Sequence, residues 1–146
     1  VSSRYFGVHT FYMVDEKGTK QAFRWTMVPE AQEQVLTEEQ MKALPKSFLA
    51  KRLEEDLAKG KVHYRFQAEL AEPGDALTDP SVQWPTDRKT VNLGKLTIES
   101  TGESGCDLTN YDPNLLSQGF MPSEDEVLKL RSTAYAISFS KRITGQ

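Results

Sequence analysis

Alternating apolar and polar residues indicate β-structure in the first part of the chain. Phe6 to Val14 is rich in aromatic and β-branched residues, and Gln21 to Val28 places apolar side chains at every second position. Between them, Asp15 to Gly18 has the composition of a tight turn. The pattern therefore predicts a hairpin of two strands.

Two short helices are expected next. Thr37 to Gln40 has the pattern of a capping box, which opens a helix that Pro45 stops. Ser47 is placed to cap a second helix, which ends near Gly60. The apolar residues of this second helix recur at every fourth position: Leu49, Leu53 and Leu57.

Two further strands follow these helices. Val62 to Leu70 alternates strictly between apolar and polar residues, and Thr90 to Glu99 is again rich in β-branched and apolar residues. Residues 72–88 and 101–122 contain many prolines, glycines and aspartates, so we expect both stretches to be irregular.

The last predicted element is an amphipathic helix from Ser123 to about Arg142. Ser123 and Glu126 form a capping box that fixes its start. Four of its residues are expected to pack against the body of the protein: Leu128, Leu130, Ala134 and Ile137. About four strands in an antiparallel sheet, helices between the second and third strands, and this terminal helix make the predicted fold class α+β, with residues 1–146 as a single domain.

Composition narrows the functional classes. The net charge is −3 and there is no basic run, which argues against nucleic acid as a partner. No stretch approaches the ~20 consecutive apolar residues of a membrane span, so no membrane partner is expected. The single cysteine, Cys106, cannot form a disulfide within the chain. Because the sequence opens on Val1 without an initiator methionine, we expect residues to have been removed upstream of it.

The closing helix carries the candidate site. Arg131 and Tyr135 stand four residues apart, so their side chains share a helix face and can meet. Ionising a free tyrosine costs roughly 4 kcal/mol at neutral pH, and a nearby arginine together with a ferric ion can offset that cost. Spacing alone favours a simpler interpretation, a half-buried tyrosine whose hydroxyl meets an arginine. His9 and His63 are interpreted as sheet residues, and with Cys106 they form no zinc-site pattern.

Four motifs occur in an order and spacing that resemble one protein family. They are Tyr5 to Phe11, Asp79 to Pro85 continuing through Gly94, Asn110 to Pro113, and Arg131 to Tyr135. This succession resembles the haem catalases, and most closely their shorter branch, the catalase-related peroxidases. The resemblance covers nearly the whole chain. It implies that the sheet is the second half of a catalase-type β-barrel and that residues 1–146 are the C-terminal half of a haem domain.

The resemblance also implies roles for individual residues. Tyr135 corresponds to the axial ligand of the haem iron and Arg131 to the residue that holds it as a phenolate, and these two are the implied catalytic residues. Arg142 corresponds to an arginine that pairs with a haem propionate. Tyr111 and Val127 correspond to an aromatic and an apolar contact of the haem. The implied cofactor is haem b, and the implied partners are hydrogen peroxide and an organic electron donor.

Neither His9 nor His63 sits in the motif of the family's distal histidine, which moves a peroxide proton. The isolated chain is therefore expected to lack haem and activity. The resemblance implies that the parent protein is a haem-dependent peroxidase, homo-oligomeric and periplasmic rather than cytoplasmic. An alternative remains open, in which the chain is a non-catalytic α+β fragment that self-associates through its exposed sheet. A third hypothesis is a small module whose sheet binds an apolar ligand.

Overall fold

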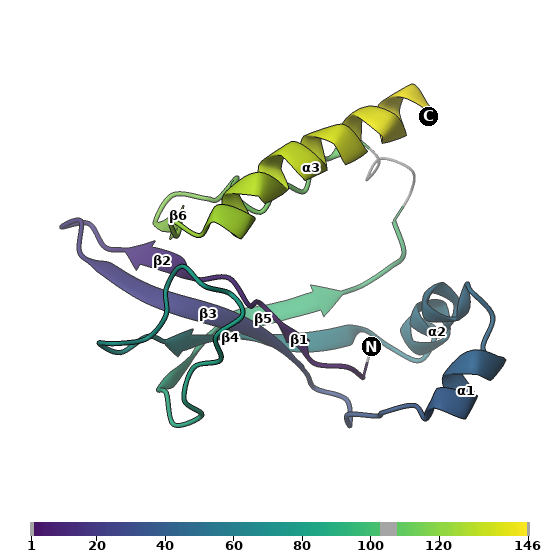
Figure 1. The fold of residues 1–146 in the computed structure, drawn as a ribbon. Helices are drawn as coiled ribbons and strands as arrows, with labels where there is room; N and C mark the ends of the chain where they lie inside the picture. Colours follow the sequence, from purple (N-terminus) through teal and green to yellow (C-terminus); the bar gives the residue numbers. More distant parts are fainter. Residues whose placement is uncertain (1, 103–107, 146) are drawn as a thin grey trace. The chain divides into compact units, whose positions relative to one another are not determined.

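The computed structural model describes residues 2–102 and 108–145, which form six strands and three helices (Figure 1). Cys106 lies outside the described residues. In chain order the elements are β1 (Tyr5–Phe6), β2 (Phe11–Val14), β3 (Lys20–Pro29), α1 (Glu38–Ala43), α2 (Phe48–Leu57), β4 (Val62–Leu70), β5 (Thr90–Ile98), β6 (Phe120–Pro122) and α3 (Glu126–Thr144). The predicted α+β class is confirmed, although the sheet has more strands than the pattern predicts.

The strands form one antiparallel sheet in the order β5-β4-β3-β2-β6, and β1 pairs separately with β3. In β2, Phe11 lies opposite both Phe23 of β3 and Pro122 of β6. The strand β6 belongs to a stretch that the sequence predicts to be irregular. Three residues ending in a proline give too short an alternation to indicate a strand.

The apolar run at the start of the chain is two strands, β1 and β2, where one was predicted. The backbone N–H of Gly7 donates to the carbonyl of Trp25 at 2.8 Å, and a Cβ on Gly7 would lie 2.4 Å from the Trp25 ring. Only glycine fits this close approach. Between the two strands, the buried side chains of His9 and Thr10 bond to Asp125 and to Arg24 of β3.

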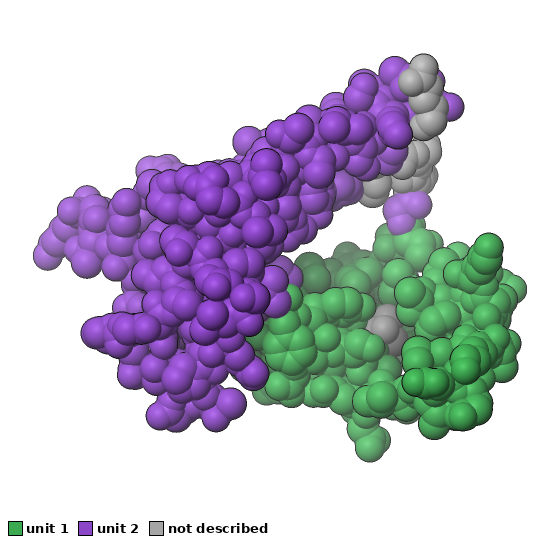
Figure 2. Space-filling model, in the orientation of Figure 1, with its two compact units in different colours: residues 1–6, 26–67, 92–101 green, residues 7–25, 68–91, 102–146 purple. Residues whose placement is uncertain are grey.

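The chain divides into two compact units, coloured separately in Figure 2. Unit 1 comprises residues 1–6, 26–67 and 92–101, and unit 2 comprises residues 7–25, 68–91 and 102–146. Strands β3, β4 and β5 contribute residues to both units.

Unit 1 holds β1, most of β4 and β5, and the helices α1 and α2. The predicted capping box is confirmed, because Thr37 and Gln40 each accept a hydrogen bond from the other's backbone N–H. Neither helix contains a buried residue, and the Leu49 side chain of α2 is 69% exposed. The buried side chains of β4 in this unit, Val62 and Tyr64, follow the predicted alternation.

Unit 2 has an aromatic core and a buried cation. The rings of Phe11 and Phe120 lie 6.3 and 6.0 Å from that of Phe23. On the other face of β3, the Arg24 guanidinium lies 4.4 Å from the Trp84 ring and burial lowers its pKa. It donates to three backbone carbonyls of the irregular stretch 72–88, those of Ala76, Asp79 and Val82. This arginine therefore anchors a stretch that has no strand or helix of its own.

Candidate functional site

The helix α3 begins at Glu126 with Asp125 as its N-cap, so the prediction that Ser123 caps it is wrong. One Asp125 carboxylate oxygen accepts hydrogen bonds from the N–H groups of Val127 and Leu128, at 2.8 and 3.2 Å. A carboxylate suits this position because the helix N-terminus carries a partial positive charge. Ser123 is buried beside it, and its hydroxyl has no hydrogen-bond partner among the described residues.

A buried interaction between Asp125 and His9 links the N-cap of α3 to the N-terminal part of the chain. The other Asp125 carboxylate oxygen lies 2.6 Å from the Nδ1 atom of His9, and both side chains are almost fully buried. Burial alone would raise the pKa of Asp125, but the hydrogen bonds from His9, Leu128 and Val127 together hold that pKa below its usual value. His9 lies between β1 and β2, so its interpretation as a sheet residue is wrong.

The other histidine lies where the sequence predicts. His63 is in β4, and its Nδ1 atom lies 3.0 Å from the Thr97 hydroxyl. Within residues 2–102 and 108–145, no three His, Cys, Asp or Glu side chains gather as a metal site. No helix of these ranges is long and apolar enough to cross a membrane.

Arg131 and Tyr135 meet on α3, as their spacing predicts. A terminal nitrogen of Arg131 donates to the Tyr135 phenol oxygen at 2.9 Å, and the guanidinium carbon lies 5.4 Å from the ring centroid. Both side chains are half-buried. A phenol oxygen that accepts a hydrogen bond from a cation is well placed to carry negative charge.

A polar network that the sequence did not reveal fixes the neighbouring loop to α3. The Asn114 amide nitrogen donates to the Leu128 carbonyl and to the Ser132 hydroxyl, both at 2.8 Å. The Ser132 hydroxyl in turn donates to Asp112 at 2.9 Å. Tyr111 adjoins this network and is 56% exposed. The turn composition of residues 112–114 was the available signal, but it does not indicate a partner.

The remaining predicted site residues lie on the same helix. Val127 is 52% exposed in the first turn. Arg142, near the C-terminal end, donates to the Thr109 carbonyl at 2.8 Å and to the Ser138 hydroxyl at 3.2 Å. Of the residues expected to pack inward, Leu128 is fully buried, whereas Leu130 and Ile137 are 69% and 55% exposed. The expected packing side is therefore wrong beyond Leu128.

These side chains fit the proximal side of a haem. The phenol oxygen of Tyr135 is an oxygen donor of the kind that ferric iron accepts, and the cationic Arg131 beside it donates a hydrogen bond to that oxygen. Tyr111 and Val127 leave aromatic and apolar surface accessible for a flat apolar group. Arg142 supplies a cation for a carboxylate, although two of its nitrogens already have partners.

No family model matches the chain. A catalase-related peroxidase of Synechococcus elongatus is 37% identical over 147 residues, covering 99% of this chain and 43% of its own length. A catalase-related peroxidase of Mycolicibacterium paratuberculosis is 31% identical over 144 residues, covering 97% of this chain and 46% of its own. The chain thus spans less than half the length of these curated relatives.

Solved catalases share the fold. A fungal catalase superposes with a TM-score of 0.84 at 17% identity, covering 97% of this chain and 31% of its own. A bacterial catalase gives 0.83 at 18% identity, with 96% and 30% covered. Catalase A from Saccharomyces cerevisiae gives 0.85 at 15% identity, with 97% and 32% covered. The fold and the curated relatives agree: the chain belongs to the catalase family.

Proposed function

We propose that this chain carries the proximal haem side of a peroxidase that decomposes hydrogen peroxide or uses it to oxidise an organic donor. The observation that carries the proposal is the 2.9 Å hydrogen bond from Arg131 to the Tyr135 phenol oxygen. The names of the two curated relatives support the reaction class. When bound, haem supplies the ferric iron at which peroxide chemistry takes place.

In this proposal Tyr135 would hold the iron through its phenol oxygen, to which Arg131 donates a hydrogen bond. A hydrogen bond to a charged group contributes about 1.5–3 kcal/mol. Tyr111 and Val127 would contact the porphyrin, and Arg142 would pair with a propionate. The buried pair of His9 and Asp125 fixes the first turn of α3. Tyr135 lies about two turns further along the same helix, so the pair also helps to fix its position.

The chain's histidines do not supply the acid or base for peroxide. His9 is buried against Asp125, and His63 bonds to Thr97 in unit 1. We therefore assign the proton-transfer group to a segment outside this sequence, which makes the isolated chain inactive and makes it the C-terminal half of the haem domain.

Substitution of Tyr135 in the full-length protein tests the ligand assignment. We expect Tyr135→Phe to lower haem content and peroxide turnover about a hundredfold or more, because the oxygen ligand is lost. Tyr12→Phe is the matched control, since Tyr12 also lies beside a cation, with the Lys20 nitrogen 5.8 Å from its ring. Soret absorbance and peroxide loss at 240 nm are the measurements. Unchanged haem content and turnover in Tyr135→Phe would refute the assignment.

The alternative concerns the isolated chain. Several sheet residues expose large apolar side chains: Tyr5 (52%), Phe6 (66%) and Leu96 (44%). Surfaces of this kind favour self-association. In this alternative the isolated chain is a haem-free oligomer, which gel filtration and an absorbance scan after haem addition would show. A monomer with a Soret band would contradict it.

Two further properties of the parent protein are proposed from the family resemblance. We propose that it is a homo-oligomer and that it resides in the periplasm. Sedimentation of the purified parent tests the first property, and fractionation of the source cells tests the second. A monomeric parent or one confined to the cytoplasm would refute the corresponding proposal.

A further inference from the structure

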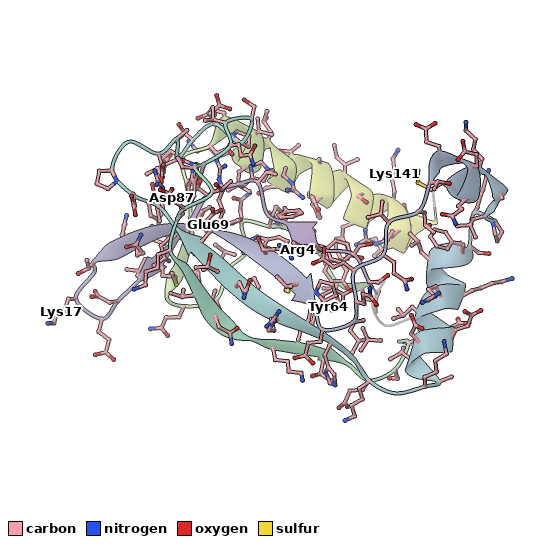
Figure 3. The ribbon with its side chains drawn as sticks, turned by 90° about the horizontal axis from the view of Figure 1, so that it is seen from below. Arg4, Lys17, Tyr64, Glu69, Asp87 and Lys141 are labelled. Atoms are coloured by element: carbon pink, nitrogen blue, oxygen red, sulfur yellow. The ribbon has the colours of Figure 1, made fainter. Side chains whose placement is uncertain are left out.

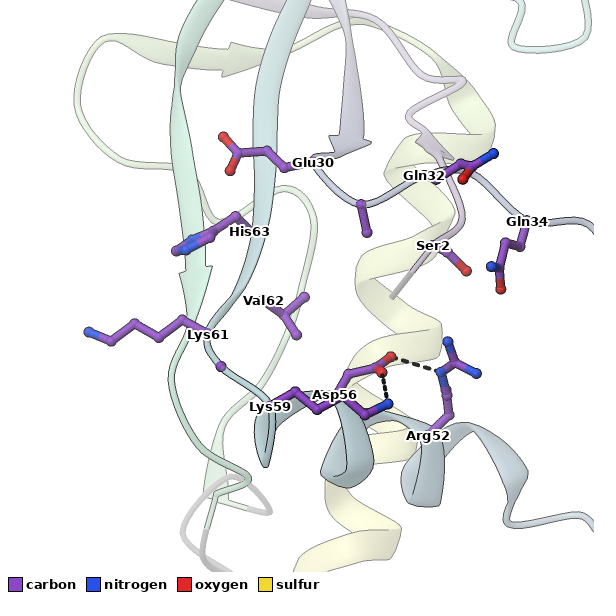
Figure 4. Close-up of a pocket in the computed structure, with 12 residues that line it drawn as sticks. Ser2, Glu30, Gln32, Gln34, Arg52, Asp56, Lys59, Lys61, Val62 and His63 are labelled. Atoms are coloured by element: carbon purple, nitrogen blue, oxygen red, sulfur yellow. Dashed lines mark hydrogen bonds and ion pairs between the residues drawn. The ribbon is translucent and has the colours of Figure 1, made fainter.

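Unit 1 contains a cavity with charged lining residues that the proposed function does not use. Its volume is about 450 Å³, and it lies between Ser2, the segment after β3, and the stretch from α2 into β4 (Figure 4). Cavities of about 300–1,000 Å³ bind small molecules. Most of the side chains that line it are polar or charged, and their carbon stems line it together with Ala31 and Val62.

The cavity wall is held by backbone hydrogen bonds at both ends of one segment. The N–H of Glu30 donates to the His63 carbonyl at 3.0 Å, and the N–H of Gln34 donates to the Ser2 carbonyl at 3.2 Å. The segment from Glu30 to Gln34, which forms one wall of the cavity, is therefore held by a backbone hydrogen bond at each end. A wall fixed in this way lowers the entropy cost of binding a ligand.

The α2 side of the cavity carries one more positive than negative charge. Asp56 accepts hydrogen bonds from the Arg52 Nε atom at 2.8 Å and from the Lys59 amine at 3.3 Å (Figure 4). The hydrogen bond from Arg52 holds the pKa of Asp56 below its usual value, so the aspartate is ionised at neutral pH. Two cations then share one carboxylate, which leaves a net charge of +1.

The other charged lining residues are neutralised by partners outside the cavity. Glu30 pairs with Lys95 at 3.1 Å, and Lys61 pairs with Glu99. These pairs cancel their own charges and leave the excess at Arg52 and Lys59. The cavity therefore favours an anion.

Arg52 has the geometry to bind that anion. Only its Nε atom is bonded to Asp56, and no acceptor within the described residues bonds to either of its terminal nitrogens. Figure 4 shows these nitrogens on the side of the guanidinium away from Asp56. Two N–H donors side by side match two oxygens of a carboxylate or phosphate.

We propose that this cavity binds a small polar anion through a carboxylate or phosphate group held by Arg52. Lys59 adds charge, and the hydroxyl of Ser2 and the amide of Gln34 supply further hydrogen bonds to the ligand. The proposal is independent of haem and of the reaction.

Calorimetric titration of the full-length protein tests the proposal. Sodium phosphate and sodium succinate are titrated separately at constant ionic strength. We expect at least one of them to bind with a Kd below roughly 10 mM. Phosphate binding alone indicates a phosphorylated ligand, and succinate binding alone indicates a carboxylic acid; both support the proposal. Binding of neither probe overturns it.

Variants of neighbouring α2 residues locate the binding. Arg52→Gln should weaken binding about tenfold or more, and Arg52→Lys, which keeps the charge but loses the paired donors, should weaken it severalfold. Lys51→Gln removes the same charge from a residue that does not line the cavity, and should leave the Kd within about twofold. Circular dichroism confirms that each variant is folded. Equal Kd values for Arg52→Gln and Lys51→Gln overturn the proposal.

Discussion

Tyr64 and Tyr135 place the same phenol group in opposite environments. Tyr64, in β4 of unit 1 (Figure 3), is 4% exposed. Its ring centroid lies 5.9 Å from that of Tyr5. Burial, reinforced by Tyr5, raises the pKa of Tyr64 to about 12. Tyr135, on α3 of unit 2, is half-buried and accepts a hydrogen bond from Arg131. The partner of the hydroxyl therefore distinguishes a structural tyrosine from a candidate anionic ligand.

The two tyrosines also differ in what supports them. Tyr64 sits in a regular strand whose buried side is apolar. Tyr135 lies on α3, which polar contacts of Asp125, Asn114 and Arg142 hold to the rest of unit 2. Removing these polar contacts one at a time should affect the Tyr135 region and leave the Tyr64 region unchanged.

The largest effect is expected from Asp125→Ala. This change removes the helix cap and leaves His9 buried without its partner, which together should cost about 2–4 kcal/mol of the free energy of unfolding. Urea unfolding followed by far-UV circular dichroism measures the loss. Glu124→Ala is the control, since the Glu124 side chain is 82% exposed and should contribute less than about 1 kcal/mol. If Asp125→Ala lowers the free energy of unfolding as little as Glu124→Ala does, the cap contributes little to stability.

The same carboxylate gives the helix a dependence on pH. Because the folded protein holds the pKa of Asp125 below its unfolded value, ionised Asp125 stabilises the fold above pH ~4. This stabilisation is lost as the pH falls through the lower, folded-state pKa. Asp125→Asn should therefore show a smaller loss of stability than the unaltered protein between about pH 5 and pH 2. If the stability of both proteins falls equally over this pH range, Asp125 is not the group responsible.

Arg131→Met should have the next largest effect, and only in the Tyr135 region. Loss of a hydrogen bond to a charged oxygen, about 1.5–3 kcal/mol, corresponds to a loss of about ten- to a hundredfold in haem affinity. Competition for haem by apomyoglobin measures the affinity of the full-length variant. Lys141→Met, an exposed change on the same helix, should leave that affinity unchanged. A similar loss in both variants would remove the specific role of Arg131.

Asn114→Ala should have a smaller effect. The loop that carries Tyr111 would lose two hydrogen bonds to α3, at a cost of about 1–2 kcal/mol. Hydrogen exchange of the amides of residues 110–116 should accelerate, while exchange in β4 stays constant. Gln118→Ala is the control, because Gln118 is exposed. Unchanged exchange in the loop would show that other contacts hold it.

Tyr64→Phe should have the smallest effect at neutral pH, about 1 kcal/mol or less, because the buried ring is retained. Its signature appears at alkaline pH. Since its pKa is raised to about 12, Tyr64 favours folding below pH ~10, and this contribution is lost as the pH rises toward 12. Absorbance at 295 nm should show a late titration step near pH 12 that disappears in Tyr64→Phe. A titration curve unaltered by the substitution would contradict this environment for Tyr64.

Sequence reasoning succeeded where the deciding interactions are local. The strict alternation of Val62 to Leu70 predicts β4 with the bounds that the structure has. The capping box at Thr37 and the contact between Arg131 and Tyr135 depend on residues three or four positions apart. Such contacts follow from helix geometry alone, so one sequence is enough to predict them.

Prediction from the sequence failed where contacts between residues far apart in the chain determine the structure. Ser123 and Asp125 are both good N-caps, and the choice of Asp125 goes with His9, which lies 116 residues away in the chain. Periodicity placed Leu130 and Ile137 on an apolar side of α3, but it does not say which apolar side is buried, and both are exposed. The loop contacts of Ser132 were missed for the same reason.

The manner in which Arg24 holds the stretch 72–88 constrains how this stretch can diverge among homologues. Every carbonyl that accepts from the Arg24 guanidinium belongs to the main chain, and any amino acid supplies one. The side chains of Ala76 and Val82 can therefore vary without loss of the anchor. An insertion or deletion between them would move the carbonyls out of reach, so we expect homologous chains that keep this arginine to vary here in composition and not in length.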